Sequence, residues 1–364
     1  MVSTQSQSKT LNEDKEVLLL ASQLACGSMV PMVLKAAIEL NLLEIIARAG
    51  PGKQLSASEI ATQLSTQKPD ALDMLERILR FLASHSILTC SVVAADDGQV
   101  QKLCYGLAPV CKYFVPNQDG VSLAPWLLMI NDRAYQESWY YLKDAFLEGG
   151  IPFNKAHGVT IYEYLGKDPR FNEMFNKAMF NASVILMKAF LETYGGFENV
   201  NVVVDVGGGL GENLYLITSK YPTIKGINFD LPHVIADAPS YPGVEHVAGD
   251  MFLNGPKGDI IFMKMILHNW SNDQCLRLLK NCYEALPEDG KVVVEEAILP
   301  ASPETNLVAK DTFAMDLRMM DVQSGGKERT EKEYSDLANR SGFNGIRFIY
   351  QVHSFTVMEF SKTM

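Results

Sequence analysis

His268, Glu296 and Glu328 are the side chains whose types and spacing best suit a proton transfer. His268 follows an apolar, strand-like run over 259–265, Glu296 ends the next such run, and Glu328 follows a glycine turn. A neutral imidazole can take a proton from a hydroxyl, and a carboxylate on its other nitrogen fixes the tautomer and stabilises the imidazolium. A phenol, with a pKa of about 10, needs such a base at neutral pH. Taken singly, each residue also fits a structural role, as a core histidine or a surface acid.

A glycine-rich loop supplies a candidate ligand site at the same end of the predicted strands. The run Val202–Gly211 reads VVVDVGGGLG, and the next strand-like run ends in Asp230, which is placed for ribose hydroxyls. Glu212 replaces the third glycine of a dinucleotide loop, and Asp205 and Asp250 would repel a pyrophosphate. A cationic ligand without phosphate suits these acids better. We therefore expect S-adenosylmethionine, a sulfonium methyl donor, as the cofactor.

The donor loop and the histidine together predict a reaction. Methyl transfer to oxygen needs in-line approach and a deprotonated nucleophile, and His268 would provide the second. Its position on the donor edge of the sheet favours the catalytic interpretation over the structural one. No H-x-x-x-H pair or close carboxylate cluster is evident, so we expect no metal.

Length, composition and charge limit the alternatives. The 364 residues, 47% of them hydrophobic, suffice for a large α/β domain and a smaller one. The net charge of -11 disfavours nucleic acid as a partner. No apolar run of about 18 residues occurs, so we expect no membrane span and a cytoplasmic protein. The six cysteines form no C-x-x-C pair, which fits reduced thiols.

The first hundred residues predict helices followed by a hairpin, as in a winged-helix module. Helical spacing over 16–48 is interrupted at Gly27 and Pro31, and its apolar surface is large enough to serve either a dimer interface or packing within the domain. Ser56-Ala57-Ser58-Glu59 predicts a capping box, and Asp70 can cap a further helix. The strands 89–93 and 100–105 would flank the turn Asp96-Asp97-Gly98. The predicted recognition helix carries mixed charges, so we expect a scaffold rather than a DNA reader.

The remaining sequence predicts an α/β fold. Residues 110–195 are largely helical and rich in aromatic and methionine side chains, which suits either a pocket for a flat ring or a plain helical core. Strands are expected over 202–206, 226–230, 244–248, 259–265 and 291–296, with a closing region over 347–359. Helices between these strands imply a mostly parallel sheet covered on both faces, a Rossmann-like domain.

Several uncommon motifs resemble one family. The chain is similar to the plant caffeic acid O-methyltransferase family over nearly its whole length, on the runs 205–211, 228–234, 243–246, 249–252 and 325–330. The resemblance implies a homodimer. It also implies a winged-helix-like dimerisation domain over 1–115, and a helical acceptor-pocket insert with a Rossmann-like methyltransferase domain over 116–364.

The resemblance implies roles for individual residues. His268 would be the general base, flanked by Glu296 and Glu328. The donor site would comprise Ser183, Gly207, Asp230, Leu231, Asp250, Met251, Phe252, Lys264 and Trp270. The candidate acceptor pocket comprises Met129, Ile130, Tyr135, Ile161, Leu165, Phe171, Phe175, Met179, Asn269, Arg318, Met319 and Gln323.

The departures from the family pattern concern the acceptor. The chain has Met265–Trp270 as MILHNW where the family has WICHDW, and Phe180–Ser183 as FNAS where it has SDHS. Ile130, Leu165 and Gln323 also replace polar family residues, so we expect a small plant phenolic other than caffeate. Two alternatives remain: N-methylation of an aromatic amine, with Arg318 on a carboxylate, and a non-catalytic binding protein on the same scaffold.

Overall fold

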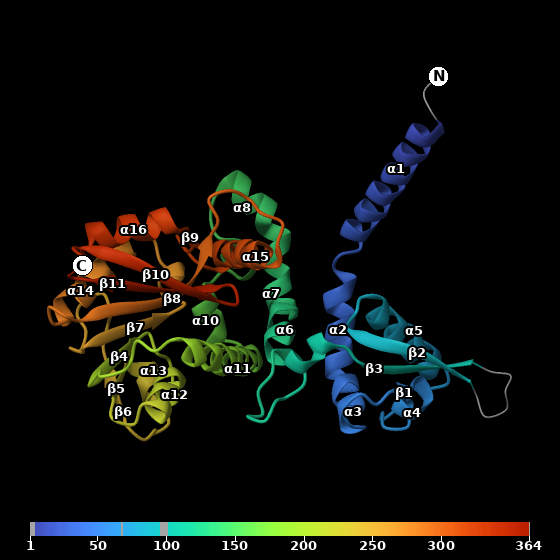
Figure 1. Cartoon of the computed structure of the whole chain (residues 1–364), viewed down its shortest axis with the longest axis horizontal. Helices are drawn as coiled ribbons and strands as arrows, with labels where there is room; N and C mark the ends of the chain where they lie inside the picture. The colour runs from blue at the N-terminus through green and yellow to red at the C-terminus, as the bar shows by residue number, and fades with distance from the viewer. Residues whose placement is uncertain (1–3, 67, 95–100, 364) are drawn as a thin grey trace. The chain divides into compact units, whose positions relative to one another are not determined.

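The computed structural model describes residues 4–66, 68–94 and 101–363 and divides into two compact units, Met1–Asn131 and Asp132–Met364 (Figure 1). The predicted domain boundary after residue 115 lies within the first of these units. The predicted turn Asp96-Asp97-Gly98 lies outside the described residues.

The first unit combines helices with a small antiparallel sheet. Its elements are α1 (Thr4–Ala25), α2 (Met29–Glu39), α3 (Leu42–Arg48), β1 (Leu55–Ser56), α4 (Ala57–Ala61), α5 (Ala71–Ser84), β2 (Leu88–Ala94), β3 (Gln101–Leu107), η1 (Pro109–Tyr113) and α6 (Ala124–Ile130). The strand order is β1-β3-β2. Leu42, Leu79 and Tyr105 are fully buried in its core. The predicted helices and hairpin are confirmed.

Capping details test the sequence interpretation of this unit. The Ser56 and Glu59 capping box is confirmed, with Glu59 N–H donating to Ser56 Oγ and Ser56 N–H to Glu59 Oε2. Asp70 stands at the N-cap of α5 but forms no side-chain capping bond. The prediction that Pro31 interrupts the helices is wrong, because Pro31 lies in the first turn of α2, where its missing N–H costs nothing.

The apolar residues over 16–48 form one buried group and one exposed group. Leu34 and Leu42 are buried within the unit, whereas Val17, Leu18, Leu19, Leu20 and Leu24 on α1 are exposed. Packing within the unit thus accounts for the apolar residues of α2 and α3. It leaves the α1 leucines without cover from their own unit.

We predict that the α1 leucines stabilise the dimer. Leu18 and Leu24 are 71% and 74% exposed, and burial of each against a second copy would contribute about 1.5–3 kcal/mol. Replacing both by Glu should raise the dimer dissociation constant at least about 100-fold, measured by analytical ultracentrifugation. Leu253→Glu, at an exposed leucine of the second unit, is the control. A double variant that dimerises like the wild type would contradict this prediction.

One bent pair of N-terminal helices is apolar enough to resemble a membrane span. Within the described ranges, no single helix is long and apolar enough to cross a bilayer. The segments Asp14–Ala25 and Met29–Glu39 pass only when taken together, and they are bent by 49°.

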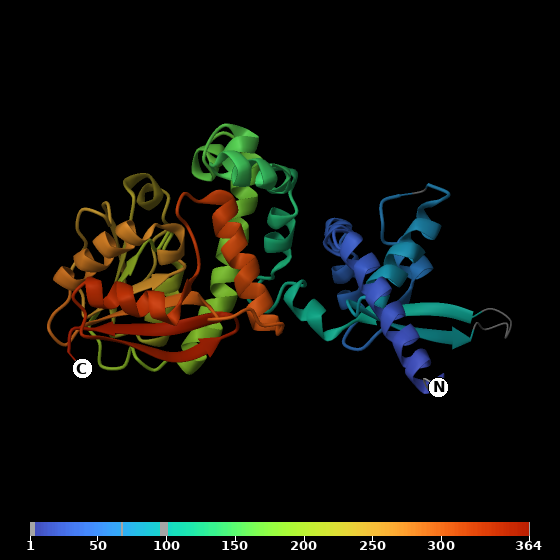
Figure 2. The ribbon, with the colours of Figure 1, turned by 90° about the horizontal axis from the view of Figure 1, so that it is seen from above.

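The second unit begins with short helices and one long one. These are α7 (Arg133–Ser138), η2 (Trp139–Tyr141), α8 (Leu142–Glu148), α9 (Pro152–His157), α10 (Ile161–Leu165) and α11 (Pro169–Thr193). The helical prediction for this region is confirmed. Leu186 of α11 packs with Met315 of α15 (Leu307–Val322), and Figure 2 shows both helices beside one end of the large sheet.

The large sheet has the order β10-β11-β8-β7-β4-β5-β6. Its strands are β4 (Val202–Val206), β5 (Lys225–Asp230), β6 (Val244–Ala248), β7 (Ile260–Lys264), β8 (Lys291–Leu299), β10 (Gly345–Val352) and β11 (Phe355–Ser361), and the short β9 (Arg329–Thr330) pairs with β8. The pairs among β4 to β8 are parallel, and β10 and β11 add an antiparallel hairpin. The mostly parallel sheet is confirmed.

Helices cover both faces of this sheet. The helices α14 (Asn272–Ala285) and α16 (Glu331–Arg340) pack on one face through residues such as Leu279 and Leu337. On the other face, α11 and α12 (Glu212–Lys220) pack through Phe190 and Leu214. A further short helix, α13 (Pro232–Ala236), follows β5. Since β4, β5, β7 and β8 are parallel, their carboxyl ends meet at one edge, where the site lies.

Candidate active site

The predicted base and its two acids converge in the structure. His268 lies in η3 (Leu267–Asn269), after β7, and is buried. Its Nδ1 is 2.7 Å from Glu328 Oε1, at hydrogen-bond distance, and 3.6 Å from Glu296 Oε2. With Nδ1–H donating to Glu328, the ring is in the tautomer that leaves Nε2 as the basic nitrogen.

The two acids have different roles. Glu296 does not end its strand as predicted, because β8 continues to Leu299. Its Oε1 accepts the backbone N–H groups of Ile266 at 2.9 Å, Leu267 at 2.7 Å and His268 at 3.4 Å. Glu296 therefore holds the backbone of the turn that carries the base. Glu328 orients the imidazole ring.

Further residues that were not predicted fix this turn. Arg329 is fully buried and donates to the carbonyls of Leu267 at 2.9 Å and Trp270 at 2.6 Å. Lys327 N–H donates to the carbonyl of His268 at 2.9 Å. Arg329 directly follows Glu328 in the sequence, and this position could have indicated that Arg329 lies near the His268 turn. The base thus sits on a rigid turn.

Burial and charge act in opposite directions on the base. Burial lowers the pKa of His268, but the negative charges of Glu296 and Glu328 outweigh it and leave the pKa raised above 6.5. Burial also raises the pKa of Glu296. The surroundings of His268 therefore favour its protonated form.

His268, Glu296 and Glu328 are also residue types that can bind a metal ion. One atom each of His268, Glu296 and Glu328 lies within 4.8 Å of the others, a spacing that could also hold a metal ion. His268 Nδ1 and Glu328 Oε1 are, however, already hydrogen-bonded, and Glu296 Oε1 already accepts backbone N–H groups. We interpret the group as a histidine base held by two acids.

The glycine loop has a backbone conformation and close contacts that require glycine. Gly207 and Gly209 have φ of 71° and 60°, a region that favours glycine. A Cβ on Gly207 would lie 2.6 Å from Ile266 Cδ1, and one on Gly208 would lie 2.2 Å from Asn228 Oδ1. The loop backbone therefore passes closer to its neighbours than any side chain would allow.

The acids around the loop face different ways. Asp230 Oδ2 accepts the Gly209 N–H at 2.9 Å, which ties the end of β5 to the loop. Asp250 Oδ1 accepts the Phe252 N–H at 2.8 Å. Asp205 is buried, accepts a bond from Asn213 at 3.1 Å, and burial raises its pKa to about 7. Asp205 thus lies in the protein interior, with its carboxylate turned toward Asn213.

The other predicted donor residues frame the same edge. Lys264 ends β7, is buried, and its Nζ lies 3.1 Å from Ser183 Oγ on α11. The rings of Phe252 and Trp270 meet edge to face, with centroids 4.8 Å apart. Leu231 follows Asp230 and is exposed. A buried ammonium, apolar rings and open backbone suit a ligand with an amino-acid tail and a flat ring.

Comparisons with known proteins agree with this geometry. A family model described as an O-methyltransferase domain matches residues 139–344, and one described as an O-methyltransferase dimerisation domain matches residues 22–117. A caffeic acid 3-O-methyltransferase of Populus kitakamiensis is 59% identical over 349 residues, which cover 96% of this chain and 95% of the relative. The chain belongs to the O-methyltransferase family. Another caffeic acid 3-O-methyltransferase, from Medicago sativa, is 58% identical with the same coverage.

Solved structures share the fold of this O-methyltransferase. Human N-acetylserotonin methyltransferase, solved with SAM, has a TM-score of 0.79 at 23% identity and covers 96% of this chain and 98% of its own. CalO1, a methyltransferase of calicheamicin biosynthesis solved with SAH, has a TM-score of 0.79 at 23% identity and covers 95% and 98%. The predicted Rossmann-like methyltransferase fold and the enzyme class are confirmed.

The predicted acceptor residues of the O-methyltransferase are distributed over both units. Met129 and Ile130 belong to the first unit and the other ten to the second. Tyr135, Ile161, Leu165 and Phe171 are buried, whereas Phe175, Met179, Asn269, Arg318, Met319 and Gln323 are partly exposed. Phe171 packs edge-on against Tyr164 at 5.8 Å, which favours a structural role for its ring. Asn269 Nδ2 donates to the carbonyl of Met265 at 3.0 Å.

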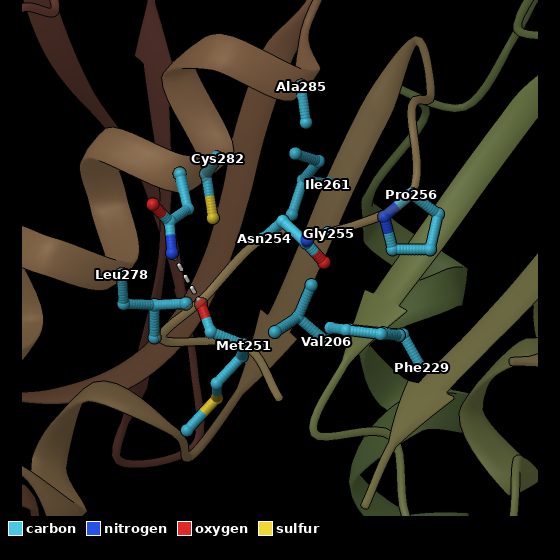
Figure 3. Close-up of a pocket in the computed structure, with 11 residues that line it drawn as sticks. Val206, Phe229, Met251, Asn254, Gly255, Pro256, Ile261, Leu278, Cys282 and Ala285 are labelled. Atoms are coloured by element: carbon cyan, nitrogen blue, oxygen red, sulfur yellow. Dashed lines mark hydrogen bonds between the residues drawn. The ribbon is translucent and has the colours of Figure 1, made fainter. Parts of the chain in front are cut away.

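An apolar pocket lies beneath the donor-site segment 250–252. Figure 3 shows Val206, Phe229 and Met251 around it, with Leu278 and Cys282 of α14 opposite. Asn281 Nδ2 donates to the carbonyl of Met251 at 2.8 Å, the dashed line in Figure 3. Sequence reasoning missed Asn281, since its role depends on how α14 packs. The bond anchors the segment to the helix.

We predict that Asn281→Ala weakens donor binding. Loss of this hydrogen bond, worth about 1 kcal/mol, should raise the Kd for S-adenosylmethionine about 3- to 10-fold by loosening Met251 and Phe252. Isothermal titration calorimetry measures the change. Lys280→Ala, at an exposed neighbour on the same helix, is the control. Equal affinities in Asn281→Ala and the wild type would show that the segment needs no anchor.

Proposed function

We propose that this O-methyltransferase is a homodimer that transfers a methyl group from S-adenosylmethionine to a hydroxyl of a small plant phenolic, with His268 as general base. The observation that carries the proposal is the 2.7 Å contact of His268 Nδ1 with Glu328, on the sheet edge that also carries the glycine loop. The dimerisation-domain match and the exposed α1 leucines support the homodimer. The six free cysteines fit a cytoplasmic location.

The residues present fit the proposed donor. A Cβ added at Gly209 would meet nothing within 4 Å, so the loop backbone has open space beside it there. Lys264 would face the carboxylate of the donor's amino-acid tail, and Phe252 and Trp270 would frame its adenine. Asp230 would accept the ribose hydroxyls through its remaining lone pairs. When bound, the donor supplies an electrophilic methyl group on a positively charged sulfur.

The base then acts on the acceptor. The phenolic hydroxyl would donate its proton to Nε2 of His268, which leaves the oxygen as the nucleophile. The donor would supply the methyl group in line with its C–S bond, which breaks and releases S-adenosylhomocysteine. The Nδ1–H bond to Glu328 stabilises the imidazolium that results. Glu296 and Arg329 hold the turn, so that Nε2 stays in place during the reaction.

The acceptor is proposed as a phenolic other than caffeate. Leu165 stands where the family has a polar residue and offers no hydrogen bond to a ring substituent, and a pocket without such groups discriminates through shape. The curated relatives at 58–59% identity are named caffeic acid 3-O-methyltransferases, so caffeate is the reference substrate for the test.

An acceptor panel tests the proposed function. Phenolic acids, coumarins, flavonoids and aromatic amines are incubated with methyl-labelled S-adenosylmethionine, and the products are identified by mass spectrometry. O-methylated phenolics support the proposal. Product confined to caffeate-like acids would overturn the choice of acceptor. Product confined to amines would instead support N-methylation with Arg318 near a carboxylate, and absence of donor binding in calorimetry would support a binding protein.

A further inference from the structure

Glu295 is a buried carboxylate that the proposed mechanism does not use. It is fully buried on β8, and neither of its oxygens has a hydrogen-bond partner in the described part of the chain. Its neighbour Glu296 points to the opposite face of the strand, toward the His268 turn. A carboxylate in such surroundings is unfavourable unless a cation lies close to it.

The cation close to Glu295 is Lys264. The parallel pairing of β7 and β8 places Lys264 directly opposite Glu295, so both side chains lie on the sheet face that α11 covers. Lys264 is also buried, and its Nζ bonds Ser183 Oγ of α11 at 3.1 Å. Among the described residues, this Nζ is hydrogen-bonded to Ser183, while neither oxygen of Glu295 is hydrogen-bonded. The two side chains are neighbours without being locked together.

The charges around Lys264 show how far the pKa of its ammonium depends on Glu295. Burial lowers the pKa of Lys264, and the charge of Glu295 is the largest influence that opposes burial. Asp205 on β4, Glu296 on β8 and Glu212 on α12 oppose it to a smaller degree. Burial in turn raises the pKa of Glu295 to about 7, against the charge of Lys264. Each group favours the charged form of the other.

We propose that Glu295 is a positioning residue for the methyl donor and acts through Lys264: its carboxylate faces the Lys264 side chain and secures the ammonium that receives the carboxylate of the donor's amino-acid tail. This inference rests on the proposed function, because it assigns Lys264 to the donor. Without Glu295, Lys264 would lose its proton more readily. The donor's carboxylate would then enter a buried site without a cation.

A double-mutant cycle tests the proposal with S-adenosylhomocysteine, which carries the same tail and cannot react. Glu295→Gln should raise its Kd about tenfold at neutral pH and more as the pH rises, and Lys264→Met should raise it at least as much. Glu295→Asp, which keeps the charge, should stay within about threefold of the wild type. In the Lys264→Met background, Glu295→Gln should add less than about twofold. An additive cycle, or unchanged or tighter binding in Glu295→Gln, would overturn the proposal.

A measurement on the wild type covers the case in which Glu295→Gln does not fold. Calorimetry at about pH 8 in buffers of different ionisation enthalpy gives the number of protons taken up when the ligand binds. A Lys264 already charged in the empty site takes up almost none, whereas uptake of about one proton would overturn the proposal. A wild type that binds neither S-adenosylmethionine nor S-adenosylhomocysteine would instead overturn the proposed function.

Discussion

Replacing His268 by alanine is expected to lower kcat for a phenolic acceptor by about 100- to 10,000-fold at neutral pH. The phenol, with a pKa of about 10, then meets the donor still protonated. Because bulk hydroxide can form the phenolate, the deficit should shrink as the pH approaches 10. Steady-state kinetics between about pH 7 and 10 measure both effects.

The control for this variant changes a histidine that lies away from His268, Glu296 and Glu328. His353 lies in the exposed turn between β10 and β11, and His353→Asn should retain the kinetics of the wild type. Calorimetry with S-adenosylmethionine shows whether His268→Ala still binds the donor. A variant that binds the donor and methylates the phenol at a near-normal rate would rule out His268 as the base.

Replacing Glu328 by glutamine is expected to lower kcat by about 100- to 1,000-fold, because an amide neither fixes the tautomer nor stabilises the imidazolium as a carboxylate does. The pH profile should shift as well. The base is active when neutral, and Glu328 helps to raise the pKa of His268, so activity in the wild type is lost as the pH falls through a value above 6.5. In Glu328→Gln this loss should occur at lower pH.

The measurement is kcat/KM against pH for the wild type and the variant. Glu333→Gln is the control, since Glu333 caps α16 and pairs with Lys327 in the loop before β9, and the imidazole is bonded to Glu328 instead. If kcat/KM of Glu328→Gln fell at the same acidic pH as that of the wild type, Glu328 would not set the pKa of His268.

Local patterns were sufficient to predict most of the fold. The valine run of β4, the glycines after it and Asp230 at the end of β5 are contiguous signals, and the structure confirms the strands that they predict. The same holds for the capping box at Ser56, which is formed within four residues. Pro31 was misread because the sequence does not show whether a proline stands in the first turn of a helix or breaks it.

The site required the tertiary structure. The sequence pattern predicted that Glu296 and Glu328 lie near His268. It could not show that Glu296 binds the backbone of the turn and Glu328 binds the imidazole ring, because these contacts depend on the tertiary structure. No role for Glu295 follows from the sequence alone, because its place opposite Lys264 comes from the pairing of β8 with β7. Asn281 likewise gains its role only from the packing of α14 against Met251.

The most direct test of the central claim compares a phenol with its matched aromatic amine as acceptors for the wild type and for His268→Ala. The methylated atom is identified by mass spectrometry with labelled S-adenosylmethionine. We predict an O-methylated product from the wild type, its near-complete loss in His268→Ala at neutral pH, and little product from the amine. A dominant N-methylated product that forms at the same rate without His268 would contradict the proposed function.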